Sequence, residues 1–267
     1  MQGIYLYCIC KTDSLTGIEG NGIDEKYPVY LHPMQRLTAA VSQVTLSDFV
    51  GPESEANFKE LSWIAPRALR HEEIIEQIML ESPVLPVRFG SVFSSLEQIE
   101  KALIRHHDTI LNFLIDISDK EEWTLKGFMD RELAKKTLLK DILEEKGVEY
   151  AALSQGVRYL KEQKLKATVE KDLQVWLRKT CGDITGALKD KAVNYCERRL
   201  LSKTETGAEL DMIFNTAFLL QKNGLDGFKA KVEQLNINYE QNGLVLELTG
   251  PWSPYSFSPQ LEQEDDE

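Results

Sequence analysis

The sequence predicts an α+β protein with two domains and an extended C-terminal tail. Short apolar segments with strand-like alternation lie near the start of the chain. A charged, proline-free region from Arg131 to about Ser202 has helical periodicity. Strand and helix patterns in the second half follow the order β, long α, β, β, α, β, which is the ferredoxin-like order with an enlarged first helix. We expect an N-terminal α+β domain over residues 1–119, a modified ferredoxin-like domain over 120–249 with a long helical insertion, and a tail over 250–267.

Composition excludes several classes of protein. The 267 residues include 31 basic and 43 acidic ones, for a net charge of −12, so bulk charge does not favour nucleic acid binding. Four cysteines in a chain of this length do not make a disulfide framework, and we expect reduced thiols in a cytoplasmic protein. No signal peptide pattern and no 18-residue apolar window are present, so we expect no membrane span.

In the first half, four strands and two helices are expected, and three of the strands precede the first of these helices. These three strands cover Gly3–Cys10, Val29–His32 and Leu37–Thr45. Pro66 suits the first position of a helix that ends near Leu80, because its missing N–H is not needed there. A second helix begins after a Ser94-x-x-Glu97 capping box and ends near Ser118.

Between those helices lies an apolar stretch with a single charge, Arg88. A strand over Val84–Arg88 between two helices would be largely buried. A buried guanidinium needs several acceptors, so we expect Arg88 to connect strand, helix and loop. We predict a structural brace made of Arg88, Phe89 and Gly90 together with His71, a core histidine on the apolar stripe of its helix.

The second half supplies the ferredoxin-like pattern. Within the helical region, Gly147 and Gly182 are the expected interruptions. Leu153, Val157 and Leu160 begin an apolar seam with spacing of three and four. The remaining expected elements are a strand over Glu122–Met129, a strand or hairpin over Glu209–Gln221 that turns near Asn215-Thr216, a helix over Asp226–Leu235 and a strand over Leu244–Thr249.

The tail carries three aromatic residues on a path that two prolines keep extended. We expect this segment to pack along the fold as a strap. If it does not dock fully, Trp252, Tyr255 and Phe257 are candidate anchors for a partner, because aromatic side chains dominate binding energy at interfaces. The acidic run Glu262–Glu267 is expected to be disordered.

No catalytic or metal-binding constellation is recognisable in the sequence. Cys8-x-Cys10 lacks further ligands at metal spacing, and no cofactor motif is present. No nucleophile, base and orienting group come together. We therefore expect no enzyme, metal or cofactor. The alternative is a small-anion-binding enzyme that uses His71 and Arg88, which requires both side chains to reach one open pocket.

Several separated motifs, in order, carry a resemblance to a known family. They are Tyr5-Leu6-Tyr7, Leu37–Ser42, His71-Glu72, Leu85–Phe93, Glu122-Trp123-x-x-Lys126, Asn215-x-Ala217-Phe218-Leu219 and Gly250–Phe257. With these motifs the chain resembles the gas vesicle protein F/L family over nearly its whole length. One departure is Ser253, where the family usually has proline. The resemblance does not separate the F member from the L member.

The resemblance implies a non-catalytic role. Family members look like minor components or assembly factors of gas vesicles, so we expect the chain at the gas vesicle, with no nucleic acid partner. The implied partners are the apolar gas vesicle shell protein and other gas vesicle accessory proteins. We expect the chain to bind the shell protein during nucleation and to prevent its aggregation.

Overall fold

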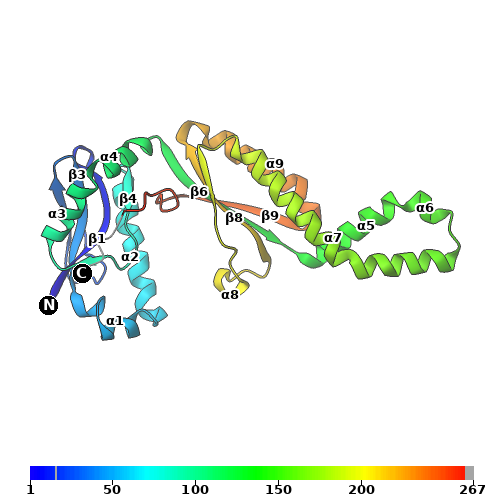
Figure 1. The fold of residues 1–267 in the computed structure, drawn as a ribbon, viewed down its shortest axis with the longest axis horizontal. Helices are drawn as coiled ribbons and strands as arrows, with labels where there is room; N and C mark the ends of the chain where they lie inside the picture. Colours follow the sequence, from blue (N-terminus) through cyan, green and yellow to red (C-terminus); the bar gives the residue numbers. More distant parts are fainter. Residues whose placement is uncertain (16, 262–267) are drawn as a thin grey trace. The chain divides into compact units, whose positions relative to one another are not determined.

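The computed structural model describes residues 1–15 and 17–261 and divides the chain into two compact units (Figure 1). Unit 1 contains Met1–Glu121 and the segment that begins at Pro251, and unit 2 contains Glu122–Gly250. The chain therefore passes from one unit to the other twice. The predicted boundary lay between 119 and 120, and the observed one lies between Glu121 and Glu122. The predicted disorder of Glu262–Glu267 lies outside the described residues.

Unit 1 is built on an antiparallel sheet with the strand order β2-β3-β1-β4, in which β5 also pairs with β1. Its strands are β1 (Gln2–Lys11), β2 (Val29–Met34), β3 (Leu37–Thr45), β4 (Val84–Pro86) and β5 (Val92–Phe93). The register of β1 against β3 shifts between Leu6 and Cys8. This bulge places Tyr7 and Cys8 in the same core cluster, whereas Leu6 and Ile9 lie in the other.

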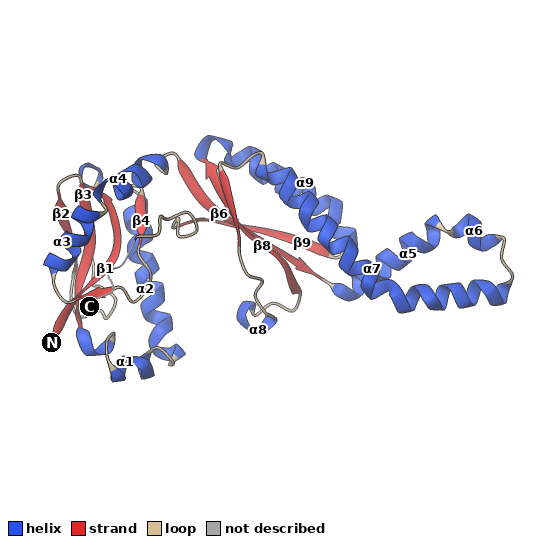
Figure 2. Ribbon diagram, in the orientation of Figure 1, coloured by secondary structure: helices blue, strands red, loops and turns tan. Residues whose placement is uncertain are grey.

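Helices cover both faces of this sheet (Figure 2). They are α1 (Pro52–Asn57), α2 (Leu61–Met79), α3 (Leu96–Arg105) and α4 (His107–Asp116). Ile74, Ile75 and Ile78 of α2 pack on one face, and α3 and α4 pack on the other. A strand buried on both faces has a nearly continuous apolar sequence, as β1 and β3 do.

Two helix predictions in unit 1 are wrong at their boundaries. Pro66 lies inside α2 rather than at its start, because the helix begins at Leu61. The long helix expected up to Ser118 is two helices, since His106 has φ −104° and ψ 13° and ends α3. Ser95 precedes α3 and its side chain makes no capping hydrogen bond, so the predicted capping box at Ser94 does not form.

Unit 2 contains a four-stranded sheet with the order β7-β8-β6-β9. Its strands are β6 (Lys120–Met129), β7 (Asn194–Glu197), β8 (Asp211–Gln221) and β9 (Leu244–Trp252). Its helices are α5 (Arg131–Glu145), α6 (Gly147–Ala151), α7 (Gln155–Lys189), α8 (Lys203–Thr206) and α9 (Leu225–Tyr239). The 3-10 turns of the chain are η1 (Thr12–Ser14), η2 (Leu46–Asp48), η3 (Lys222–Gly224) and η4 (Glu240–Asn242). Ile184 and Leu188 of α7 and Phe228 and Val232 of α9 pack in the main core of this unit.

The second half departs from prediction at three places. Asn215-Thr216 is not a turn, because β8 runs through it as one strand and pairs antiparallel with β7. The strand β7 lies in the region expected to be helical. Gly182 does not interrupt α7, and a Cβ added there would meet nothing within 4 Å.

Candidate functional site

The most connected polar cluster in unit 1 surrounds His71. This residue lies on α2, is 0% exposed, and its Nδ1 is 3.0 Å from the hydroxyl of Tyr5 on β1. Its Nε2 is 3.0 Å from the carbonyl oxygen of Val87 and 3.0 Å from the hydroxyl of Tyr255. His71 therefore contacts the first strand, the segment after β4 and the C-terminal strap.

The hydrogen-bond partners fix the tautomer of His71. The Val87 carbonyl can only accept, so Nε2 carries the proton and donates it. Nδ1 is then an acceptor for the Tyr5 hydroxyl, whose oxygen in turn accepts from the Gly90 N–H at 2.8 Å. The Tyr255 hydroxyl donates to Glu72 Oε1 at 2.9 Å. Each donor in this network has an acceptor.

Burial controls protonation in the cluster. It lowers the pKa of His71 to about 4, against the hydrogen bond to Val87 that raises it, so the imidazole is neutral at pH 7. Burial also raises the pKa of Tyr5 and of Tyr255 far above the usual range. It raises the pKa of Glu72 as well, although the hydrogen bond from Tyr255 acts in the opposite direction. At neutral pH the histidine and both tyrosines are therefore uncharged.

The prediction that Arg88 is buried is wrong. Strand β4 ends at Pro86, and Arg88 opens a turn in which its carbonyl accepts from the Ser91 N–H at 3.2 Å. The turn directs the side chain outward, and Arg88 is exposed. Within residues 1–15 and 17–261 its guanidinium has no hydrogen-bond or ion-pair partner, so it is not a brace.

Phe89 and Gly90 contact the cluster where Arg88 does not. The Phe89 ring lies 5.9 Å from the His71 ring, centroid to centroid, in an edge arrangement. Gly90 has φ +87°, a left-handed conformation that favours glycine, and this places its N–H against Tyr5. A Cβ at Gly90 would also approach the Phe58 ring at 3.3 Å. His71 itself is buried, so it does not share an open pocket with Arg88 as the enzyme alternative requires.

The three aromatic residues of the tail have different environments. Tyr255 is half-buried and held by His71 and Glu72, so its hydroxyl is not available to a partner. Phe257 is also half-buried, whereas Trp252 is 44% exposed. Of the predicted anchors, Trp252 is the most exposed.

Sequence reasoning missed the tyrosines of the network. The hydroxyl of Tyr7 accepts from the Ile23 N–H at 2.8 Å and lies 2.8 Å from Ser42 Oγ. A signal was present, because two tyrosines on an otherwise apolar buried strand need polar partners. Their partners could not be named from sequence, since they come from segments far apart in the chain.

A second polar arrangement lies in unit 2, on the face of the sheet away from α7 and α9. The carboxylate of Glu122 on β6 is buried and forms an ion pair with Arg198, which also donates to Thr124 Oγ1 at 3.1 Å. Asn215 on β8 donates to the Arg199 carbonyl at 2.8 Å. These contacts fasten residues 198–210 (the α8 segment) to the sheet.

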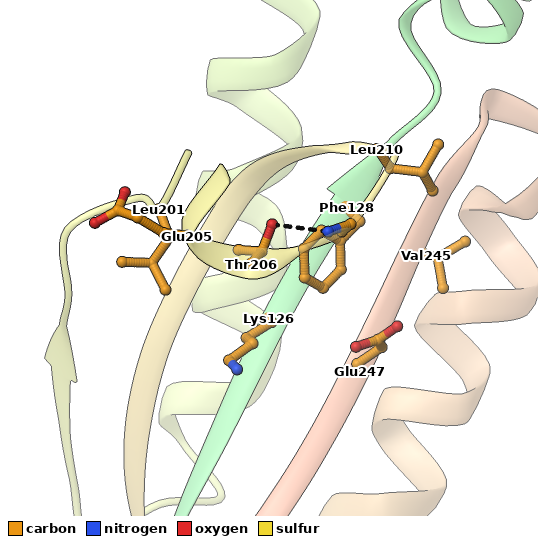
Figure 3. A pocket seen from close by; sticks show the side chains of 9 residues that line it. Lys126, Phe128, Leu201, Glu205, Thr206, Leu210, Val245 and Glu247 are labelled. Atoms are coloured by element: carbon orange, nitrogen blue, oxygen red, sulfur yellow. Dashed lines mark hydrogen bonds between the residues drawn. The ribbon is translucent and has the colours of Figure 1, made fainter. Parts of the chain in front are cut away.

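A groove of about 310 Å³ lies between the α8 segment and the sheet (Figure 3). Lys126 and Phe128 come from β6, and Val245 and Glu247 from β9. The other lining residues are Leu201, Glu205, Thr206, Ala208 and Leu210 of the α8 segment. The sheet side of the groove combines two apolar side chains, Phe128 and Val245, with two charged ones, Lys126 and Glu247, so the groove has a mixed polar and apolar lining.

No metal site is apparent in the parts of the chain that the structure describes: no three His, Cys, Asp or Glu residues there are grouped to hold an ion. Cys8 and Cys10 are free and buried in the core, and burial raises the pKa of both thiols. Among the described helices, none combines the length and the apolar character needed to cross a membrane.

Comparison with known proteins places this mixed helix and sheet architecture among gas vesicle proteins. The chain is 24% identical over 263 residues to gas vesicle protein L of Streptomyces sp. (strain CB03234), which covers 97% of this chain and 94% of that one. It is 28% identical over 192 residues to gas vesicle protein F of the same strain, covering 71% and 76%. The crystal structure of gas vesicle protein GvpF from Anabaena sp. PCC7120 matches with a TM-score of 0.69 at 19% identity, over 100% of both chains.

The model of the family described as gas vesicle synthesis protein GvpL/GvpF matches residues 3–259. The chain belongs to this family, which gives it a role in gas vesicles. The relatives compared above are named gas vesicle proteins L and F. The resemblance noted in the sequence is thereby confirmed.

Proposed function

We propose that this protein binds the apolar shell subunit of the gas vesicle during nucleation, keeps it from aggregating, and remains as a minor vesicle component. The observation that carries the proposal is the family match over residues 3–259. An apolar shell subunit exposes a large hydrophobic surface before assembly, and such surfaces aggregate unless they are covered. A chain with net charge −12 would keep the complex in solution.

The strand order of unit 2 supports the finer architectural proposal. A ferredoxin-like sheet places its first strand between the third and the fourth, with the second strand at the edge. Counted within unit 2, β6 lies between β8 and β9, and β7 lies at the edge. We propose that residues 120–249 form a ferredoxin-like domain in which α5, α6 and α7 replace the first helix.

Two surfaces are candidates for contact with the shell subunit. One is the groove beside the α8 segment, where Phe128, Val245 and Leu210 provide apolar contact area. The other is Trp252, which is 44% exposed at the end of β9. Aromatic side chains of this kind anchor interfaces, so Trp252 remains the tail residue to test.

Co-expression with the shell protein tests the proposed function. A tagged version of the full chain is expected to raise the soluble fraction of the shell protein and to co-purify with it. A matched experiment with an unrelated acidic protein of similar size controls for a general effect of expression load. Unchanged solubility together with failure to co-purify would overturn the proposal.

Trp252→Ala tests how much the Trp252 side chain contributes to binding of the shell protein. Trp63→Ala is the control for loss of a tryptophan in unit 1. Trp63 packs against Phe49 and Phe58 and serves the core. We expect W252A to reduce co-purification and to change the unfolding transition less than W63A does. W63A is expected to change the unfolding transition, so the two effects are separable.

A further inference from the structure

Unit 2 carries a helical arm with very little core. The arm consists of α5 from Lys135 onward, α6 and the first half of α7, over residues 135–172 (Figure 2). Tyr150 is the one buried residue in this range. The Lys161 ammonium lies 5.3 Å from the centre of its ring, and Arg158 donates to its carbonyl at 3.1 and 3.2 Å. Polar contacts thus hold the inner face of α7 in the arm.

The outer face of α7 in the arm exposes apolar side chains. Val157 and Leu160 are 45% and 68% exposed, although the sequence pattern predicted that they pack in a seam. Helical spacing places Lys164, Ala167 and Lys171 on the same stripe, and all three are exposed. In contrast, Leu173 further along α7 is 1% exposed, so α7 has fully buried apolar side chains only beyond the arm.

The charge on this outer face is positive, in a chain that is acidic overall. Lys164, Lys171 and Arg178 are exposed there. The acidic residue at its margin, Glu170, is bound to Arg131 at 3.2 Å and to Lys135 at 2.9 Å. Its carboxylate is therefore already neutralised, and the face presents lysines beside apolar anchors.

We propose that the outer face of α7, from Val157 to Arg178, docks an acidic amphipathic helix of another protein. Apolar side chains spaced by three and four on such a helix would cover Val157 and Leu160, and its carboxylates would pair with Lys164 and Lys171. An anionic membrane fits less well, because the net charge of −12 repels the chain as a whole from an anionic surface. The proposal does not depend on binding of the shell subunit.

A synthetic peptide tests the proposed surface on the full chain. The probe is a fluorescent helix-forming peptide with leucine at spacings of three and four and glutamate on its flanks, and its binding is followed by anisotropy. We expect saturable binding that salt weakens, and about tenfold weaker binding to K164E/K171E. L160S is also expected to weaken binding. A control with two other exposed lysines reversed, K59E/K191E, keeps the net charge equal and is expected to bind like the parent protein.

Far-ultraviolet circular dichroism verifies that the variants remain helical, which is expected because the altered side chains are exposed. Equal binding by K164E/K171E and K59E/K191E, or no binding of the peptide at all, would overturn the proposal. Binding to phosphatidylserine vesicles in place of the peptide would also overturn it. Self-association that K164E/K171E abolishes in sedimentation, without peptide binding, would assign the surface to a second copy and reject the proposed occupant.

Discussion

Individual side chains in unit 1 are defined by a hydrogen-bond network whose members are distant in sequence. His71 connects to Tyr5 and Tyr255, and Tyr255 connects to Glu72. A buried polar group without a partner costs about 1–3 kcal/mol, so each member stabilises the position of the next. Removing a single hydrogen-bonding atom from this network is therefore expected to change the stability of unit 1.

Replacing Tyr255 with phenylalanine removes one oxygen from this network. The Glu72 carboxylate loses its donor, and we expect unit 1 to lose about 1–3 kcal/mol of unfolding free energy. Urea unfolding measures the change. Tyr159 is 60% exposed, so Y159F is the matched control and is expected to change stability by less than about 0.5 kcal/mol. Equal effects of Y255F and Y159F would contradict the role given to the hydroxyl.

The lowered pKa of His71 predicts a stability that depends on pH. The unfolded chain binds this proton near pH 6.5, whereas the folded chain binds it only at about 4. The unfolded state thus holds more protons between these values, and stability falls as pH falls from 6.5 to 4, by on the order of 3 kcal/mol. Glu72 acts in the opposite sense, because its raised pKa lets the folded state take up a proton first.

Comparison of H71Q with H106Q isolates the contribution of His71 to the pH dependence of stability. H71Q is expected to be less stable at pH 7 and to lose much of the dependence between pH 6.5 and 4, as measured by unfolding at each pH. H106Q keeps His71 and is expected to retain that dependence. A slope in H71Q equal to that of the parent protein would show that His71 is not its source.

At the scale of elements, one side chain protects a sheet edge. Strand β9 lies at the edge of the unit 2 sheet. The Asn236 side chain of α9 donates to the Leu246 carbonyl at 2.8 Å and accepts from the Leu246 N–H at 2.6 Å. The amide thus occupies the place of a neighbouring strand, and open edges are otherwise prone to pair with other chains.

Asn236→Ala is expected to expose this edge. The Leu246 amide should exchange with solvent hydrogen faster, and unit 2 should lose about 1–2 kcal/mol, because two hydrogen bonds to backbone groups disappear. Hydrogen exchange measures the first effect. Asn238 is exposed on the same helix, and N238A is expected to leave exchange at Leu246 unchanged. Protection that persists in N236A would mean that the edge is covered in another way.

Comparison of the observed strands with the predicted ones shows which of them apolar sequence patterns can predict. The predicted bounds of Leu37–Thr45 agree with β3, because this strand is apolar throughout and bounded by polar turns. The strand β7 was missed, since its four residues are mostly exposed and carry no apolar alternation. Asn215 suggested a turn, but its side chain serves the backbone of the α8 segment. Polar residues with long-range partners therefore mislead local prediction.

Local sequence patterns also explain which residues of the candidate site were placed correctly and which were not. Apolar periodicity on α2 placed His71 in the core, where the structure has it. Arg88 was misplaced because the apolar sequence around it continues past the end of β4 into a turn. The partners of His71 come from β1 and from the strap, and no periodicity within one segment encodes contacts of that range.

For the whole molecule, the discontinuity of unit 1 is the main feature. Its last segment is separated from the remainder of the unit by all of unit 2. We expect a variant that lacks residues 253–267 to show faster hydrogen exchange in β1 and α2 of unit 1, because Tyr255 no longer contacts His71. The sheet of unit 2 should be unaffected. A uniform change in both units, or no change, would contradict this prediction.

The late position of Tyr255 has a consequence for biosynthesis. The ribosome makes Tyr5 and His71 first and Tyr255 only after the whole of unit 2. In a nascent chain, the His71 imidazole therefore lacks its contact with Tyr255 until translation has passed residue 255. The hydrogen-bond network of unit 1 can therefore be completed only in a chain in which unit 2 has already been synthesised.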